Sequence, residues 1–114
     1  PGVLAFRTGA ALHLHVDSTV PGNAGAVSYV EVQYLTSWDG MGAARISCVY
    51  GCSCVEVVVD ARRRTGERIS VDTLIRLPVT QSPICIIKVV NLGAQGAPAK
   101  WKLTAVQVGW NSSR

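Results

Sequence analysis

Hydrophobic and polar residues alternate along several short stretches of the chain. In residues 12–16, leucine and valine positions are separated by histidines, and residues 29–34 alternate in the same way. Because successive side chains of a β-strand point to opposite faces of its sheet, this pattern predicts strands with one buried face. Val30, Val32 and Tyr34 are expected to face the core. Residues 85–90 are apolar on both faces, which predicts a central strand covered on both sides.

Turn residues close each of these stretches. Clusters of Pro, Gly and Asn at 21–25, 39–42 and 93–98 mark the places where the chain reverses. The expected strands cover residues 2–7, 11–17, 27–36, 43–49, 54–60, 67–77, 83–92 and 99–110. About eight short strands separated by turns predict a single all-β domain over residues 1–114. We expect a disulfide-stabilised two-sheet antiparallel β-sandwich of jelly-roll or immunoglobulin-like type. The basic segment 62–68 is expected to form the exposed tip of a hairpin.

Composition narrows the possible functions of this domain. The 114 residues are 48% hydrophobic and 16% charged, and they include 7 Asp+Glu and 2 His. Few groups are therefore present for acid–base catalysis, and the nucleophile-elbow, HExxH, P-loop and dinucleotide motifs do not occur. We expect a protein that is not an enzyme and binds no cofactor.

The charge and termini refine this picture only slightly. The net charge of +4 is a mild excess, and the arginine-rich segment 62–68 lacks the interleaved aromatic residues of a nucleic-acid platform. No run of about 18 apolar residues occurs, so no membrane-spanning segment is expected. The chain begins at Pro1 close to a predicted strand and without a signal-peptide pattern, which is typical of a mature or excised domain.

The four cysteines allow three disulfide pairings. Cys48, Cys52 and Cys54 lie close together, whereas Cys85 lies on a distant predicted strand. A Cys52–Cys54 bridge is least favoured, because two residues in an extended strand are near the upper limit of the separation that a disulfide tolerates. We prefer Cys48–Cys54 with Cys52–Cys85, and a Cys48–Cys52 bridge remains a close alternative. A bridge from Cys52 to Cys85 would stabilise the fold by about 3–4 kcal/mol.

Disulfides and a glycosylation sequon point to the same compartment. Disulfides persist in oxidising environments, and Asn111 begins an Asn-Ser-Ser sequon. We therefore expect an extracellular or cell-surface glycoprotein that carries its glycan at Asn111. No metal site is expected, because the cysteine spacing differs from paired zinc knuckles, and His13, His15 and Asp17 lack a further ligand.

Tryptophan residues are the main candidates for ligand contact. Trp38 lies beside Asp39 in a predicted loop, where an exposed ring can stack on the C–H face of a sugar. Trp101 and Trp110 are nine residues apart on one predicted strand, so we expect them on opposite faces, with at least one in the core. Core packing is the competing interpretation for each tryptophan. The candidate carbohydrate-binding residues are Trp38, Asp39, Arg62, Arg63 and Arg64.

Several segments resemble a known family. The segments are YLTSWDGMG at 34–42, ISC at 46–48, GCSC at 51–54 and SPICI at 82–86. Together they resemble the C-terminal β-sandwich domain of plant- and alga-type SGNH-hydrolase-like extracellular proteins, over roughly residues 27–92. The resemblance implies an extracellular, disulfide-bonded accessory module associated with cell-wall or other extracellular glycan. The Gly-Asp-Ser nucleophile motif and the Asp-x-x-His pair of the separate catalytic domain are absent, so no catalytic residue is carried over.

Two functions of different class follow from these observations. The first is a non-catalytic extracellular module with a structural or carbohydrate-associated role, whose partner is extracellular glycan. The second is a self-assembling subunit of an extracellular filament or coat, in which the segment from Val3 to Phe6 completes the sheet of a neighbouring copy. An ordinary edge strand is the simpler interpretation of that segment. A small hydrolase is a weaker third alternative.

Overall fold

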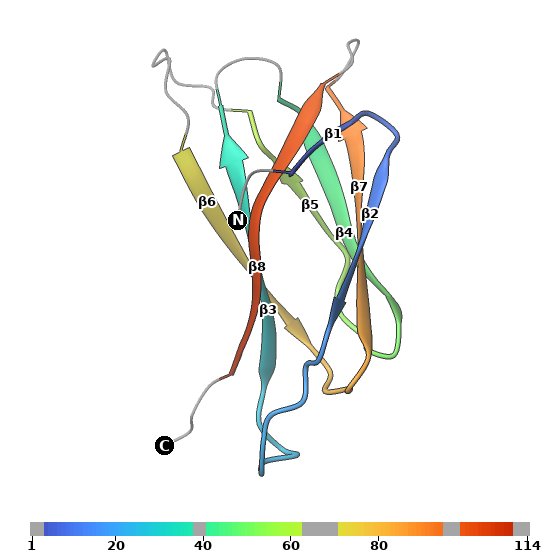
Figure 1. The fold of residues 1–114 in the computed structure, drawn as a ribbon, viewed down its shortest axis with the longest axis vertical. Coiled ribbons are helices and arrows are strands. Elements are labelled where there is room, and N and C mark those ends of the chain that lie inside the picture. Colours follow the sequence, from blue (N-terminus) through green and yellow to red (C-terminus); the bar gives the residue numbers. More distant parts are fainter. Residues whose placement is uncertain (1–3, 38–40, 63–70, 95–98, 111–114) are drawn as a thin grey trace.

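Two four-stranded antiparallel sheets pack face to face in this protein (Figure 1). The computed structural model describes residues 4–37, 41–62, 71–94 and 99–110. Its strands are β1 (Leu4–Arg7), β2 (Ala11–Val16), β3 (Ser28–Thr36), β4 (Ala43–Tyr50), β5 (Val57–Asp60), β6 (Val71–Val79), β7 (Cys85–Gly93) and β8 (Lys100–Trp110). The predicted disulfide-stabilised two-sheet β-sandwich is confirmed. Within the described ranges, no helix has the length and apolarity that crossing a bilayer requires.

The strand order is that of a jelly roll. One sheet has the order β1-β8-β3-β6 and the other the order β2-β7-β4-β5. The first strand therefore pairs with the last, the second with the seventh, the third with the sixth and the fourth with the fifth. This pairing corresponds to one long hairpin that folds around a core, as in jelly rolls. An immunoglobulin-like sandwich distributes its strands between the two sheets in a different order.

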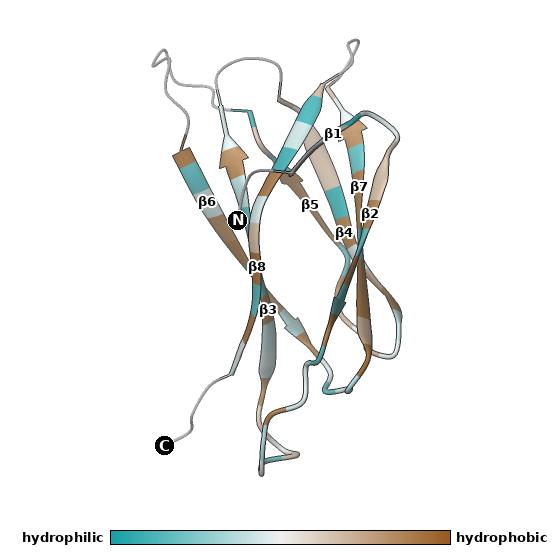
Figure 2. Ribbon diagram, viewed as in Figure 1, coloured by the Kyte–Doolittle hydropathy of each residue, from teal (hydrophilic) through white to brown (hydrophobic). Residues whose placement is uncertain are grey.

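Alternating residues of the two inner faces form the core. Val30 and Val32 are fully buried, and the ring of Tyr34 stacks on Trp101 with centroids 4.9 Å apart. Hydrophobic residues accordingly colour much of both sheets in Figure 2. Burial, together with the negative charge of Asp60, raises the pKa of Tyr34. The predicted inward orientation of these β3 residues is confirmed.

Strand β7 lies between β2 and β4, so its predicted central position is confirmed. Cys85, Ile87 and Val89 are fully buried on its inner face. Ile86 and Lys88 on its outer face are only half-buried. The apolar sequence predicted that both faces of this strand are covered. The inner face of β7 is fully covered, whereas its outer face is covered only in part.

A β-bulge changes the faces expected for two tryptophans. Where β3 pairs with β8, Gln33 lies opposite Ala105 and Tyr34 opposite Leu103, so β8 contains one extra residue. An extra residue reverses the alternation of side chains beyond it. The prediction that Trp101 and Trp110 point to opposite faces is therefore wrong. Trp101 is fully buried, as expected for at least one of them, while Trp110 lies at the end of the strand and is 48% exposed.

Two strand boundaries differ from the prediction. The strand expected at 54–60 begins only at Val57, because the cysteine at its start lies in the disulfide-bonded connection. The strand expected at 67–77 extends to Val79 and includes Pro78. Proline is tolerated there because β6 is an edge strand, where an amide hydrogen facing outward has no ladder partner to lose.

The basic segment 62–68 is not the tip of a hairpin. Strand β5 precedes it and pairs with β4, whereas β6 follows it and pairs with β3 in the other sheet. The connection therefore crosses from one sheet to the other. Of this segment the structure describes only Arg62.

Candidate functional site

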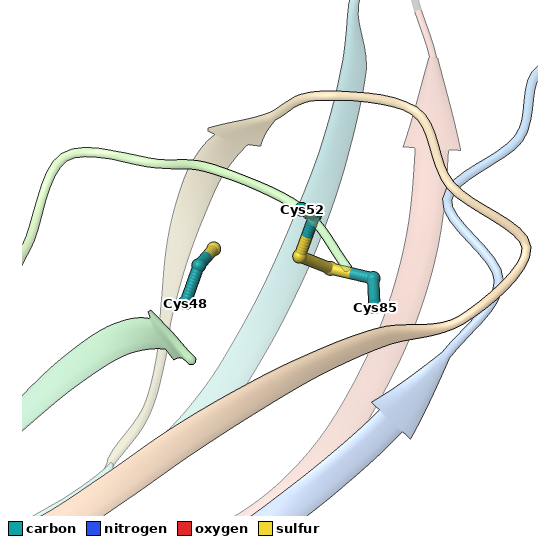
Figure 3. Close-up of side chains that lie close together, drawn as sticks. All are labelled: Cys48, Cys52 and Cys85. Carbon is teal, nitrogen blue, oxygen red and sulfur yellow. A yellow bond between two sulfur atoms is a disulfide. The ribbon is translucent and has the colours of Figure 1, made fainter. Parts of the chain in front are cut away.

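Two disulfides fix the connection between β4 and β5 to the start of β7. Cys48 is bonded to Cys54 and Cys52 to Cys85, with Cα–Cα distances of 5.7 and 5.1 Å. The preferred pairing is thereby confirmed. The sulfur atoms of Cys48, Cys52 and Cys85 lie within 4.8 Å of one another (Figure 3). They are the only group of three metal-ligating side chains among the described residues, and each sulfur belongs to a disulfide rather than to a thiolate.

A glycine shapes this cystine cluster. Gly51 has a φ of 78°, in the left-handed region that side chains rarely adopt. A Cβ at this position would collide with the backbone carbonyl of Ile84. Gly51 therefore lets the chain pass close to the residue before Cys85, which brings Cys52 within bonding distance of it.

The segments that carry the sequence-predicted ligand residues meet at one end of the sandwich. Ser37 forms a parallel bridge with Arg62, and Met41 forms one with Lys100. The amide of Ser37 donates to the carbonyl of Ala61 at 3.0 Å. We call the end of the sandwich marked by Ser37, Met41, Arg62 and Lys100 the loop end; it lies at the top of Figure 1.

Of the predicted carbohydrate-binding residues, the structure describes only Arg62, which is paired with Ser37. Trp38, Asp39, Arg63 and Arg64 lie outside the described residues.

Arg62 itself is held by a neighbouring carboxylate. Its Nε donates to both oxygens of Asp60, at 3.0 and 3.2 Å, and its Nη2 donates at 2.8 Å. These hydrogen bonds, reinforced by the charge of Asp60, raise the pKa of Arg62. Its backbone amide also donates to Asp60 Oδ1 at 2.9 Å. Arg62 is therefore a fixed, charge-balanced member of the loop end.

Buried polar side chains hold the strand ends beneath the loop end. Asn91 is fully buried; its Nδ2 donates to the carbonyl of Ala99 at 2.9 Å, and its Oδ1 accepts from the amide of Gly93 at 2.8 Å. The Thr8 hydroxyl donates to the same Ala99 carbonyl and accepts from the Ala99 amide. The ends of β7 and β8 are thus fixed relative to each other and to the β1–β2 connection.

A second candidate site lies on the outer face of the β1-β8-β3-β6 sheet, toward the opposite end. It is an open hollow with about 270 Å³ of empty space, including its mouth. We call it the face hollow; its lining residues are Tyr29, Glu31, Arg76, Gly109 and Trp110. They come from three adjacent strands, because Glu31 of β3 pairs with Arg76 of β6 on one side and with Gln107 of β8 on the other.

A buried carboxylate organises the face hollow. Glu31 is only 9% exposed, although it lies on the outer side of the sheet. Its Oε2 accepts from Arg76 Nε at 2.9 Å and lies 2.7 Å from Arg76 Nη2 in an ion pair, and its Oε1 accepts from Gln107 Nε2 at 2.6 Å. The Gln107 hydrogen bond, followed by those from Arg76, lowers the pKa of Glu31. The Arg76 guanidinium carbon also lies 5.4 Å from the centre of the Tyr29 ring, within the range of a cation–π contact.

Sequence reasoning missed the face hollow. The alternation in residues 29–34 places Tyr29 and Glu31 on the outer face, but Glu31 was one of several scattered carboxylates with no indicated partner. Arg76 and Gln107 belong to strands far away in the sequence. Only the register of the three strands brings these side chains together, and local periodicity contains no information on register between distant strands.

The other sequence candidates are dispersed. His13 and His15 are exposed on β2, while the leucines and valine between them are half-buried, as predicted. Asp17 Oδ1 accepts from the Thr19 amide at 2.9 Å, and hydrogen bonds from Thr19 lower the pKa of Asp17. This carboxylate therefore caps a turn. Asn111 lies outside the described residues.

The segment proposed for strand donation pairs within its own chain. Strand β1 lies at the edge of a sheet, with Leu4 opposite Leu103 and Arg7 opposite Lys100 of β8. This is the arrangement of an ordinary edge strand. Comparisons with protein-family models, curated proteins and solved structures found no match. The resemblance to SGNH-hydrolase-like extracellular proteins stays a prediction, and function is inferred from the residues of this chain.

Proposed function

We propose that this protein is a non-catalytic extracellular module that associates with cell-wall or matrix glycan and carries glycan at Asn111. Its two disulfides are consistent with an oxidising compartment. The observation that carries the proposal is the bridge between Ser37 and Arg62, which pairs the residue that precedes Trp38 with the first arginine of the 62–64 group.

The chemistry of the loop end suits a sugar ligand. An indole ring offers a flat apolar surface to the C–H face of a pyranose, while arginine and aspartate side chains donate to and accept from its hydroxyl groups. The Asp60–Arg62 pair and the Asn91 hydrogen bonds hold the strand ends in place before a ligand arrives. Such preorganisation reduces the entropy cost of binding.

Affinity electrophoresis through gels that contain soluble glucans, mannans or galactans tests this proposal. We expect a retarded wild-type protein and a loss of affinity of about tenfold or more for Trp38→Ala, as is typical of a central aromatic contact. Tyr50→Ala is the matched control, because Tyr50 is an exposed aromatic residue at the cystine cluster. Equal retardation of both variants and the wild type would contradict a contact at Trp38.

Intact mass spectrometry of protein secreted from eukaryotic cells tests the compartment. We expect reduction to add two hydrogen atoms for each of two disulfides and N-glycosidase treatment to remove a glycan from Asn111. Free thiols in the secreted material, or an unmodified Asn111, would contradict the corresponding part of the proposal.

A further inference from the structure

The face hollow combines groups that sugar-binding sites use. An aromatic ring, a guanidinium and a carboxylate line an open depression that also includes a glycine. We propose that the face hollow binds one uncharged pyranose unit of a glycan chain, at a subsite separate from the loop end. The inference extends the proposed glycan association, and the two sites fail independently in the experiment below.

The size of the face hollow limits its ligand. Pockets that enclose drug-sized molecules measure roughly 300–1,000 Å³. The comparable cavity volume of the face hollow is only about 100 Å³. One ring lying on the surface fits such a depression, and the rest of a chain can continue into solvent.

The polar groups are held ready for adjacent hydroxyls. Arg76 Nε donates to Glu31 Oε2, and Nη2 lies 2.7 Å from the same oxygen. The two N–H groups of Nη1 remain for oxygen atoms of a ligand. Gln107 donates to the other Glu31 oxygen. Glu31, held in this way, acts as a positioning residue for Arg76.

The charge balance favours an uncharged sugar. Among the described residues, Arg76 is the only cation that lines the face hollow, and Glu31 already neutralises it at 2.7 Å. A ligand carboxylate that approached Arg76 would also approach the Glu31 carboxylate, and like charges at short range repel each other. Hydroxyl groups accept from the same donors without that cost.

Aromatic surface completes the subsite. The Tyr29 ring lies beside Arg76 on the outer face and lines the face hollow. Trp110 borders the hollow at the end of β8, although the register places it opposite the buried Ser28, on the inner side of the sheet. Aromatic side chains provide the apolar surface on which the C–H face of a pyranose packs.

Gly109 is a position at which a substitution can block the face hollow. It lies opposite Tyr29 in the ladder, and a Cβ built on it would meet nothing within 4 Å. Its φ is not positive, so other residues can adopt its backbone conformation. A larger side chain at Gly109 therefore fills the hollow without a clash. Ala105 is exposed on the same strand and is the matched control position.

Isothermal titration with neutral gluco-, manno- and xylo-oligosaccharides tests the subsite. We expect at least one series to bind the wild-type chain, Gly109→Leu to weaken that binding about tenfold or more, and Ala105→Leu to leave it unchanged. Tyr29→Ala is the second variant, which decides the question if Gly109→Leu does not fold, because the Tyr29 ring lines the hollow on the outer face. Unchanged affinity in Gly109→Leu, or no binding of any neutral series, would overturn the proposal. Preferred binding of an oligouronate that weakens with salt would also overturn it.

Trp38→Ala separates the two sites. Binding that is lost in Gly109→Leu but kept in Trp38→Ala supports the face hollow and contradicts the loop end as the glycan contact. The reverse pattern contradicts the face hollow and supports the loop end. Loss in both variants supports two subsites on one glycan chain, since each then contributes to the measured affinity.

Discussion

Two serines of this protein are equally buried but differ in their hydrogen bonds. Ser18 and Ser28 are both fully buried. The Ser18 hydroxyl bonds the carbonyls of Thr80 and Ser82 and accepts from the Ser82 amide, whereas the Ser28 hydroxyl has no hydrogen-bond partner. Removing a bonded hydroxyl leaves its buried partners unsatisfied, while removing an unbonded one relieves a desolvation cost.

We therefore predict opposite outcomes for two chemically identical substitutions. Ser18→Ala is expected to lower the free energy of unfolding by about 1–3 kcal/mol, and Ser28→Ala to leave it unchanged or raise it slightly. Urea unfolding monitored by tryptophan fluorescence measures both. Equal destabilisation by the two substitutions would show that burial alone, without the hydrogen bonds, determines the effect.

Single residues also show where sequence reasoning succeeds and where it stops. The cysteine pairing was predictable only in part: covalent geometry disfavours a bridge between Cys52 and Cys54, but it left Cys48–Cys52 as a close alternative to the observed Cys48–Cys54 bond. The face occupied by Trp110 was not, because it depends on one extra residue in β8. Nothing in the local sequence of β8 marks that bulge; it is defined only relative to the partner strand β3.

At the scale of elements, a side chain of β3 links this strand to both of its neighbours on the outer face of the sheet. Its Glu31 bonds to Arg76 on β6 and to Gln107 on β8, so one side chain links three strands. The lowered pKa of Glu31 makes this link dependent on pH. The ionised form is stabilised by folding, so its contribution is present above the ordinary carboxyl pKa of 4.5 and is lost as pH falls through the lower pKa of the folded state.

We predict a smaller acid sensitivity for Glu31→Gln. Between about pH 5 and pH 2 the free energy of unfolding of the wild type should fall more steeply than that of the variant. Glu56→Gln is the matched control, because Glu56 pairs with Arg45 at 3.3 Å on the other sheet with both side chains about half exposed. Parallel pH profiles for the wild type and Glu31→Gln would contradict the prediction; urea unfolding across this range measures them.

The two disulfides are expected to contribute unequally to stability. Cys52–Cys85 spans 33 residues, whereas Cys48–Cys54 spans 6. In the chain-entropy account, replacing Cys52 and Cys85 together by serine should cost about 3–4 kcal/mol, and replacing Cys48 and Cys54 about 2 kcal/mol. Unfolding of the two double variants without reductant measures the difference. An equal loss would indicate that local packing at the cluster outweighs loop closure.

The positions of the strands were more predictable than their pairing. Alternation and turn residues located all eight strands to within a few residues, because both depend on neighbours in sequence. The partner of each strand depends on contacts across the whole chain. The hairpin expected around Arg62 was wrong for this reason, since the jelly roll sends β5 and β6 to different sheets.

The whole molecule explains why its candidate sites were only partly visible in the sequence. Trp38 and the arginines at 62–64 were recognisable in the sequence one at a time, but nothing in the sequence indicated that Ser37 pairs with Arg62. The face hollow needs three strands in one register before its carboxylate, guanidinium and amide meet. The jelly-roll pairing of strands produces both the contact between Ser37 and Arg62 and the register of β6, β3 and β8.

The fold also bears on self-assembly. Strand β1 is hydrogen-bonded to β8 of its own chain, so donating it to a neighbour would first require breaking that pairing. We predict a monomer in analytical ultracentrifugation at high protein concentration. A concentration-dependent polymer would instead favour the filament alternative, and deletion of residues 1–7 would then abolish it.

The antiparallel pairing of β1 with β8 covers only part of β8. Leu4 lies opposite Leu103 and Arg7 opposite Lys100, so β1 pairs with the first residues of β8, next to the loop end. From Ala105 to Trp110, β8 pairs with β3 on one side and with no other described strand on its second side. The first sheet is therefore closed along β8 near the loop end and has an open edge along β8 toward the opposite end.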